Sequence, residues 1–136
     1  MEHLFPLRVY MEDTDTGGIV YYVNYLKFME RARTELLREL GFEQASLKSC
    51  GLIFVVHSAT CKYLQPSYLD DELQVETVIE ALSPVAISFE QRVRRIGDRQ
   101  VTCFAQVKIA SVNADTIKPV RLPKPLKKAL ESYLKK

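Results

Sequence analysis

Three acidic residues, Glu12, Asp13 and Asp15, lie in a short polar stretch just before a predicted helix. Two glycines, Gly17 and Gly18, separate them from the aromatic residues that begin this helix. The first turn of a helix carries backbone N–H groups without intrahelical acceptors, and such groups can polarise a bound carbonyl. A carboxylate beside them can attack that carbonyl or activate water. The stretch therefore favours a hydrolytic site, and the alternative is that Asp13 or Asp15 only caps the helix.

Other kinds of catalytic site find little support in the sequence. The chain has no G-x-S-x-G motif, and its only histidines are His3 and His57, so a Ser-His-Asp hydrolase is not expected. His57 is in phase with apolar residues of a predicted strand, which favours a core or interface position. Histidines and cysteines lack the spacing of metal ligands, and neither a P-loop nor a dinucleotide fingerprint is present. We therefore expect no metal site and no cofactor.

Two further groups of residues are candidates for contacts with a substrate. Glu30 lies at the edge of the apolar stripe of the predicted helix, where it could orient substrate or water. The alternative for Glu30 is a surface ion pair with Lys27 or Arg33. Basic residues cluster later in the chain, first Arg92, Arg94, Arg95 and Arg99 and then Lys118, Arg121 and Lys124, and the expected substrate contacts among them are Arg94, Arg95 and Arg99. Arginine suits the phosphates of a nucleotide-bearing substrate, and the alternative is that these cations protect a solvated sheet edge.

Composition narrows the class of protein. The 136 residues are 47% hydrophobic and 26% charged, which predicts one globular domain, residues 1–136, with a substantial core. The formal net charge of +2 is too small to suggest a nucleic-acid partner. The chain shows neither a transmembrane segment nor a signal-peptide pattern. Three widely spaced cysteines give no disulfide framework, so we expect a cytoplasmic location: Cys50, Cys61 and Cys103.

The hydrophobic pattern predicts the elements that position these residues. A strand from Leu4 to Met11 precedes a helix from about Tyr22 to Leu40, and Gly41 stands where a C-terminal cap belongs. Four strands with period-two alternation follow near 53–63, 73–81, 87–94 and 101–109. Their short links predict a largely antiparallel sheet, and a short amphipathic helix begins near Pro125.

One face of this sheet should pack against the helix. The alternation places further apolar side chains on the opposite face, where a partner subunit could cover them: Phe54, Val56, Val78 and Phe104.

Two segments resemble a known family. Residues 13–25, DTDTGGIVYYVNY, resemble the signature of the 4-hydroxybenzoyl-CoA thioesterase-like branch of the hotdog fold. In that signature an Asp precedes a small-Gly-Ile/Val-Val-aromatic-Tyr-x-x-Tyr run. Residues 63–77, YLQPSYLDDELQVET, are similar to the Tol-Pal-associated acyl-CoA thioesterases of the same branch. The resemblance covers nearly the whole chain and implies an α+β hotdog fold, in which a largely antiparallel five-stranded sheet wraps a long central helix.

The resemblance also implies a function. By position, Asp15 is the catalytic nucleophile or general base, and the backbone N–H near Tyr22 polarises the thioester carbonyl. Gly18 permits close approach, and we expect Tyr25, Glu30 and the three arginines to contact the substrate. The expected reaction is hydrolysis of acyl-CoA to free acid and coenzyme A.

The resemblance further implies a homodimer or homotetramer with active sites at subunit interfaces. Acyl carrier protein is a second candidate carrier of the acyl group. The alternative function is a non-catalytic protein that binds acyl thioesters or acyl carrier protein as a scaffold. A hydratase is disfavoured, because no Asp–His pairing is evident.

Overall fold

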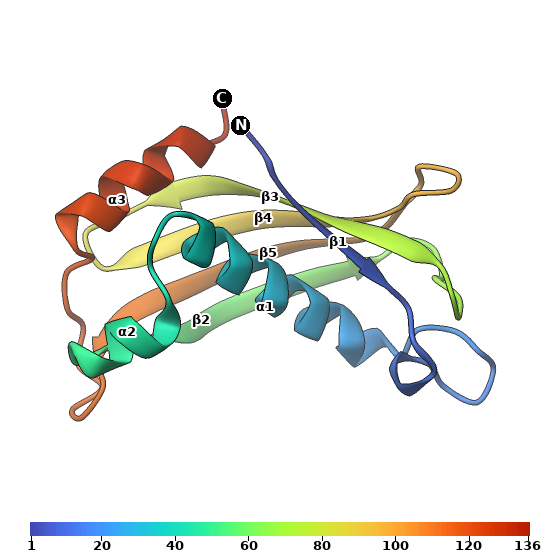
Figure 1. Ribbon diagram of the computed structural model, residues 1–136, viewed down its shortest axis with the longest axis horizontal. Helices are drawn as coiled ribbons and strands as arrows, with labels where there is room; N and C mark the ends of the chain where they lie inside the picture. The colour runs from blue at the N-terminus through green and yellow to red at the C-terminus, as the bar shows by residue number, and fades with distance from the viewer.

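One long helix lies in the concave side of a curved five-stranded sheet, in a computed structural model that describes residues 1–136 (Figure 1). The strands are β1 (His3–Arg8), β2 (Leu52–Tyr63), β3 (Glu72–Leu82), β4 (Ala86–Arg95) and β5 (Val101–Asn113). The helices are α1 (Tyr22–Glu39), α2 (Gln44–Ser49) and α3 (Lys124–Leu130), with 3₁₀ turns η1 (Met11–Asp13) and η2 (Glu131–Tyr133). None of the helices combines the length and the apolar character needed to cross a membrane.

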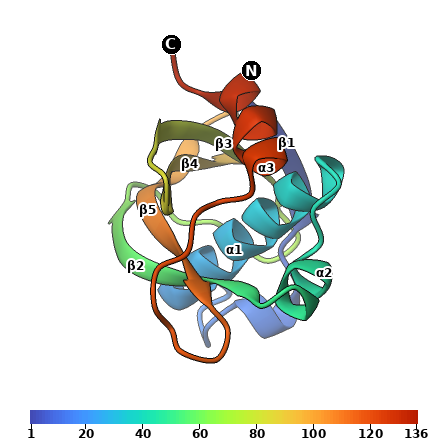
Figure 2. The same cartoon turned by 90° about the vertical axis from the view of Figure 1, so that its left-hand side faces the viewer.

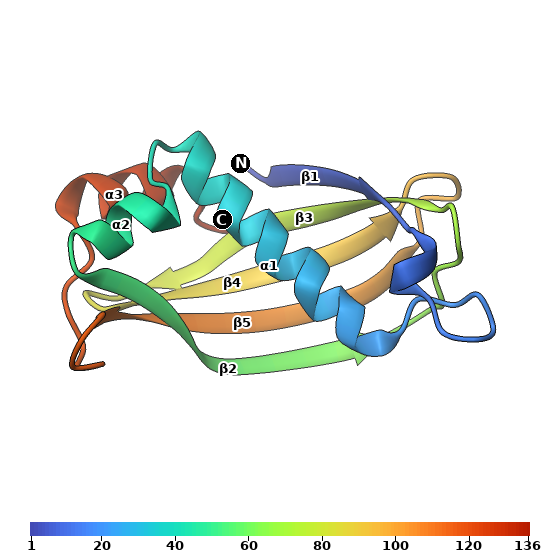
Figure 3. The same ribbon diagram turned by 60° about the horizontal axis from the view of Figure 1, so that its bottom comes forward.

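The sheet has the strand order β1-β3-β4-β5-β2, and every neighbouring pair is antiparallel. Figure 3 shows α1 lying across these strands, and the end view in Figure 2 shows the sheet curling around the helix. The long central helix, the five antiparallel strands and the hotdog fold predicted from the sequence are therefore confirmed.

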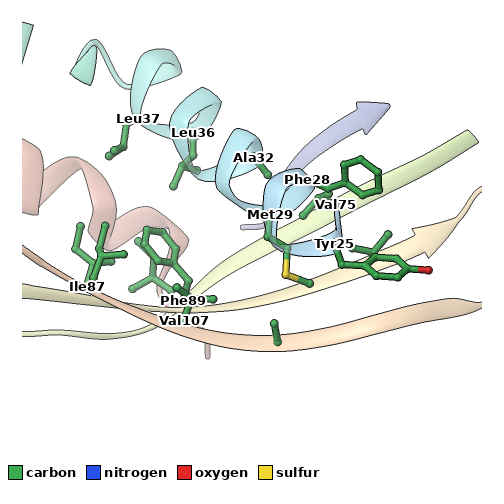
Figure 4. Packing of buried hydrophobic residues seen from close by; sticks show 14 of the residues in the cluster. Tyr25, Phe28, Met29, Ala32, Leu36, Leu37, Val75, Ile87, Phe89 and Val107 are labelled. Atoms are coloured by element: carbon green, nitrogen blue, oxygen red, sulfur yellow. The ribbon is translucent and has the colours of Figure 1, made fainter. Parts of the chain in front are cut away.

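The core lies between α1 and the middle of the sheet (Figure 4). Phe28, Met29 and Leu36 on the helix are fully buried, as are Ile87 and Phe89 on β4. Truncating a buried side chain of this size removes transfer free energy and leaves a cavity, so Phe89→Ala should cost about 3–5 kcal/mol. This packing fixes the position of α1, and with it the position of the helix start that the candidate site uses.

The C-terminal end of α1 confirms the predicted glycine cap. Gly41 has a φ of +92°, in the left-handed region that glycine adopts without steric cost. Its N–H donates to the carbonyl of Arg38 at 3.0 Å, and the N–H of Phe42 donates to the carbonyl of Leu37 at 2.8 Å. These two bonds form a Schellman motif, which satisfies carbonyls that the helix itself cannot pair.

The observed elements differ from the sequence prediction in the bounds of β1 and in the presence of α2. β1 ends at Arg8 rather than Met11, because Val9 pairs with Asp71 across a loop and residues 11–13 form η1. Helix α2 was not predicted, since its six residues are too few to show a helical period. Asn24, in the first turn of α1, is a buried polar residue.

A bulge at His57 changes which residues of β2 face the helix. Val56 pairs with Ile109 on β5, but the next paired residue is Ser58, opposite Lys108. One extra residue reverses the alternation. Phe54 therefore packs against the core instead of the outer face, and Val56 shares that inner face. His57 is exposed, so it does not lie in the core, and an interface position for it stays a prediction.

Candidate active site

The loop before α1, the β2–β3 connection and the β4–β5 turn all lie at one end of the molecule (Figures 1 and 3). Asp13 anchors this loop to the helix. Its Oδ1 accepts a hydrogen bond from the Asn24 side-chain amide, and its Oδ2 accepts one from the Tyr10 N–H, each at 2.9 Å. The Tyr21 N–H donates to the Asp13 carbonyl at 2.9 Å. Asp13 is buried, and both carboxylate oxygens are paired, which suits a structural role.

Asp15 has a different environment, because it is exposed. Its Oδ1 accepts from the N–H groups of Gly17 at 2.9 Å and Ile19 at 3.2 Å. The Asp15 N–H in turn donates to the Ile19 carbonyl at 2.8 Å, and Gly18 makes the turn with a φ of +76°. No group of the chain donates to Oδ2. The loop therefore fixes the carboxylate through one oxygen and leaves the other oxygen without a donor from the chain.

The start of α1 lacks a side-chain cap. The N-cap residue is Tyr21, whose carbonyl accepts from the Asn24 N–H at 2.8 Å. The N–H groups of Tyr22 and Val23 have no acceptor in the chain. They also stand at the positive end of the helix dipole. Two unpaired donors at this point can bind an oxygen that becomes negative during a reaction.

An aromatic hollow of about 250 Å³ adjoins the helix start. The ring of Tyr63 lies 5.8 Å from those of both Tyr22 and Tyr25, measured between centroids. Tyr25 is only 3% exposed, and its hydroxyl donates to Oγ of Ser67 at 2.9 Å. Burial raises the pKa of Tyr25. The hydroxyl therefore stays neutral, and Tyr25 forms part of the hollow's wall.

A second groove, of about 300 Å³, lies between α1 and β2. Its lining residues include Glu30 and Arg33 together with apolar side chains of α1, β2 and β5: Val23, Leu26, Val56, Ala59 and Val107. Glu30 accepts a hydrogen bond from the Thr34 hydroxyl at 3.1 Å. No ion pair within 4.0 Å joins Glu30 to Lys27 or Arg33, so the predicted direct surface pair is not formed, although the charge of Glu30 acts to raise the pKa of Arg33.

Arg33 is a buried cation that sequence reasoning did not place in a network. Its Nη1 donates to Oε1 of Gln91 at 2.9 Å, and Nε2 of Gln91 donates at 3.0 Å to the carbonyl of Met29 and the hydroxyl of Thr77. Burial lowers the pKa of Arg33. The network joins α1 to β3 and β4 underneath the groove.

The three late arginines do not form one cluster. Arg94 donates to Glu76 at 2.8 and 3.2 Å, and Arg95 donates to Asp98 at 2.9 and 2.6 Å. Arg99 makes no ion pair, and its φ of +63° places it in the turn. The end of the molecule that carries Asp15 thus also carries Tyr22, Tyr25 and the turn with Arg99.

Ser67 is a site residue that the sequence did not reveal. Its carbonyl accepts from the Val20 N–H at 2.8 Å, and its hydroxyl accepts from Tyr25. The Pro66-Ser67 pair marks only a break between strands in the sequence. Nothing local indicates that this break packs against residues more than forty positions earlier, as the Tyr25 contact shows.

Comparison with known proteins gives matches over most of the chain. A family model described as the thioesterase-like superfamily matches residues 9–130. The acyl-CoA thioesterase YbgC of Haemophilus influenzae is 46% identical, over 92% of this chain and 91% of the relative. The acyl-CoA thioester hydrolase YbgC of Escherichia coli O6:H1 is 40% identical, over 88% of this chain and 89% of the relative.

Solved structures agree with the sequence matches. A probable thioesterase from Bartonella henselae is 37% identical, with a TM-score of 0.84 over 90% of this chain and 100% of that chain. The 1,4-dihydroxy-2-naphthoyl-CoA thioesterase Slr0204 from Synechocystis is 21% identical and shares the fold, with a TM-score of 0.89 over 96% of each chain. The chain belongs to the thioesterase-like superfamily, as the resemblance of residues 13–25 and 63–77 indicated.

Proposed function

We propose that this protein hydrolyses acyl-CoA thioesters to a free acid and coenzyme A. The main observation behind the proposal is that a carboxylate with one unpaired oxygen lies in the loop just before a helix start that has no side-chain cap. Oδ2 of Asp15 has no donor in the chain. Ile19, which is hydrogen-bonded to Asp15, is followed three residues later by Tyr22 and Val23, whose N–H groups are unpaired. The names of the relatives from Haemophilus influenzae and Escherichia coli support the same reaction.

In the proposed mechanism, the thioester carbonyl oxygen accepts hydrogen bonds from the Tyr22 and Val23 N–H groups. Asp15 Oδ2 then attacks the carbonyl carbon, or it takes a proton from a water molecule that attacks instead. The C–S bond breaks, and coenzyme A leaves as a thiolate. A thiol has a pKa of about 8.5, so this leaving group needs no strong acid near neutral pH. The site therefore needs neither a histidine nor a metal ion.

A nucleophilic role and a general-base role for Asp15 differ in where the oxygen atom of the attacking water ends. A nucleophilic attack forms a mixed anhydride, which water then hydrolyses. When water attacks the Asp15 side of the anhydride, one solvent oxygen is retained in the carboxylate. General-base catalysis places solvent oxygen only in the released acid. Turnover in water enriched in oxygen-18, followed by mass spectrometry of the peptide that contains Asp15, distinguishes the two paths.

The substrate is proposed to lie in the two hollows beside α1. Gly18 allows close approach to the carboxylate, and Tyr25 forms the wall of the aromatic hollow. Glu30 lines the groove between α1 and β2, where it can orient substrate or water. For the phosphates of coenzyme A we propose Arg99, since Arg94 and Arg95 are already paired with carboxylates.

Assembly as a homodimer or homotetramer is part of the proposal. β2 is the last strand of the sheet, so its outer edge has no hydrogen-bonding neighbour. Val56 on this strand is 58% exposed and lines the groove that holds Glu30. An unpaired edge beside an apolar surface suits pairing with a second copy. Sedimentation at micromolar concentration should give a dimer or tetramer, and a monomer that still hydrolyses acyl-CoA would contradict an interfacial site.

Three free cysteines suit a reducing compartment, so a cytoplasmic location is proposed. The main rival function is a scaffold that binds acyl carrier protein or acyl thioesters without hydrolysis. Steady release of thiol from acyl-CoA separates the two, because a scaffold releases none. A panel of acyl chain lengths, tested with the wild-type protein, would also identify the preferred acyl group.

A further inference from the structure

Arg95 connects the β4–β5 turn to the segment between β2 and β3. Its Nε and Nη2 donate to Oδ1 and Oδ2 of Asp98, at 2.9 and 2.6 Å. Its Nη1 donates to the Pro66 carbonyl at 2.6 Å, and Nη2 also donates to Oε1 of Gln65 at 3.2 Å. The Arg95 side chain is 16% exposed, against 50% for Asp98. All three guanidinium nitrogens are therefore engaged, in a place that solvent reaches poorly.

The segment that Arg95 holds is bonded in turn to the loop before α1. The Ser67 carbonyl accepts from the Val20 N–H at 2.8 Å, and the Leu69 N–H donates to the Gly18 carbonyl at 3.1 Å. Ile19 and Tyr68 form an antiparallel bridge between the same two segments. These contacts make a short two-stranded pairing between residues 18–20 and 67–69.

Ile19 connects the pairing of residues 18–20 with residues 67–69 to the carboxylate of Asp15. Its N–H donates to Oδ1 of Asp15, and its carbonyl accepts from the Asp15 N–H. Gln65 and Pro66, which Arg95 contacts directly, also line the aromatic hollow beside Tyr22. Hydrogen bonds and short backbone segments thus connect Asp98, through Arg95 and segment 65–69, to the loop that holds Asp15.

We propose that Arg95 is a positioning residue, which fixes segment 65–69 and thereby holds Asp15 and the wall of the aromatic hollow in place. The proposal rests on the proposed thioesterase function. It assigns Arg95 a role different from the phosphate contact expected from the sequence, because a phosphate would have to displace the Asp98 carboxylate or the Pro66 carbonyl.

Arg95 and Asp98 both carry a charge near neutral pH. The hydrogen bond from Arg95 is the main reason that the pKa of Asp98 falls to about 2. The same bond raises the pKa of Arg95. A charged, forked pair of this kind fixes direction as well as distance, whereas a lysine would contribute a point charge only.

The two roles for Arg95 predict opposite kinetics. A positioning role predicts that Arg95→Ala lowers kcat at least about 10-fold, because small misplacements of a reacting group are costly, with KM within about two-fold. The loss should be equal for acyl-CoA and for an acyl-pantetheine, which lacks the nucleotide phosphates. A phosphate contact predicts a raised KM for acyl-CoA, an unchanged kcat, and no effect on the pantetheine substrate.

Three further variants complete the experiment. Asp98→Asn alters an exposed turn residue, so it should fold and lower kcat by a smaller factor. Arg95→Lys should restore only part of the Arg95→Ala loss. Arg92→Ala is the matched control, because Arg92 lies on the same strand and pairs with Glu90 at 3.0 Å, away from segment 65–69. Its kcat should stay within about two-fold of wild type.

Amide hydrogen exchange gives a readout that does not depend on catalysis. The N–H groups of Val20 and Leu69 should exchange faster in Arg95→Ala and Asp98→Asn, and at the wild-type rate in Arg92→Ala. Wild-type kcat and exchange in both Arg95→Ala and Asp98→Asn would overturn the proposal, as would an effect confined to KM for acyl-CoA. If the wild-type protein releases no thiol, the proposed function fails, and exchange alone decides whether Arg95 holds the loop.

Discussion

The side-chain amide of Asn24 donates to Oδ1 of Asp13 at 2.9 Å, in a buried contact between the loop and the first turn of α1. This contact separates the roles of two acidic residues that the sequence places two positions apart. Asp13 uses both oxygens to hold the loop against the helix, whereas Asp15 keeps one oxygen free. The helix start remains uncapped, because neither carboxylate bonds to the Tyr22 or Val23 N–H.

Loss of the Asp13 carboxylate should destabilise the protein. Asp13→Ala leaves the buried Asn24 amide and the part-buried Tyr10 N–H without acceptors, and an unpaired buried donor such as the Asn24 amide costs about 1–3 kcal/mol. We expect a lower urea midpoint together with reduced thioester hydrolysis, because the loop that carries Asp15 loosens. Glu12→Ala, which changes an exposed neighbour, is the control. An Asp13→Ala variant with wild-type stability would contradict the structural role.

The buried Arg33–Gln91 contact should also be essential for stability. Gln91→Leu removes the side-chain oxygen that accepts from the buried Arg33 guanidinium, and a buried donor left without an acceptor costs about 1–3 kcal/mol, or more when it is charged. The double variant Arg33→Met with Gln91→Leu should recover much of this loss, because an apolar pair of similar volume replaces both partners. The free energy of unfolding of both variants, measured with denaturant, tests this prediction. A double variant no more stable than Gln91→Leu would contradict it.

The sequence predicted the parts of this fold that repeat along the chain. The apolar stripe of α1 and the alternation of the later strands are periodic, and each residue in them repeats the same signal. The prediction that Asp15 lies close to the start of α1 likewise depends on residues that are neighbours in the sequence. These features could be read because the interactions that cause them are local.

Other features could not be read from the pattern. The bulge at His57 inserts one residue and reverses the faces of Phe54 and Val56, yet no local signal distinguishes it from regular alternation. The contacts of Arg95 with Pro66 and of Arg33 with Gln91 join residues 29 and 58 positions apart. Such pairings follow from the sheet order, which brings distant segments together only after the fold is known.

Acidification should weaken the fold through His3. Burial lowers the pKa of His3 from its ordinary value of 6.5, against the opposing attraction of Glu39 and Glu35. Between the lowered native pKa and 6.5, the unfolded chain binds more protons than the folded chain, so stability falls as the pH falls through this window. Urea unfolding between pH 7.5 and pH 5 should show a smaller pH dependence in His3→Gln. Equal slopes in the two proteins would contradict this account.

Arg99 provides a test of the coenzyme A contact. Arg99→Ala should raise KM for acyl-CoA with little change in kcat, because a remote ionic contact acts similarly on the ground state and the transition state. The effect should shrink at high salt, where exposed charges are screened, and it should vanish for an acyl-pantetheine. An unchanged KM for acyl-CoA at low salt would place the phosphates elsewhere.

Replacing the free carboxylate tests the central claim most directly. Asp15→Asn keeps the shape of the side chain and an oxygen that can accept from the Gly17 and Ile19 N–H groups, but it removes the nucleophile or base. Steady-state release of thiol from acyl-CoA should fall at least about 100-fold in kcat, with the wild-type unfolding midpoint retained. Equal kcat values for wild type and Asp15→Asn at matched purity would contradict the assignment of Asp15 as the catalytic residue.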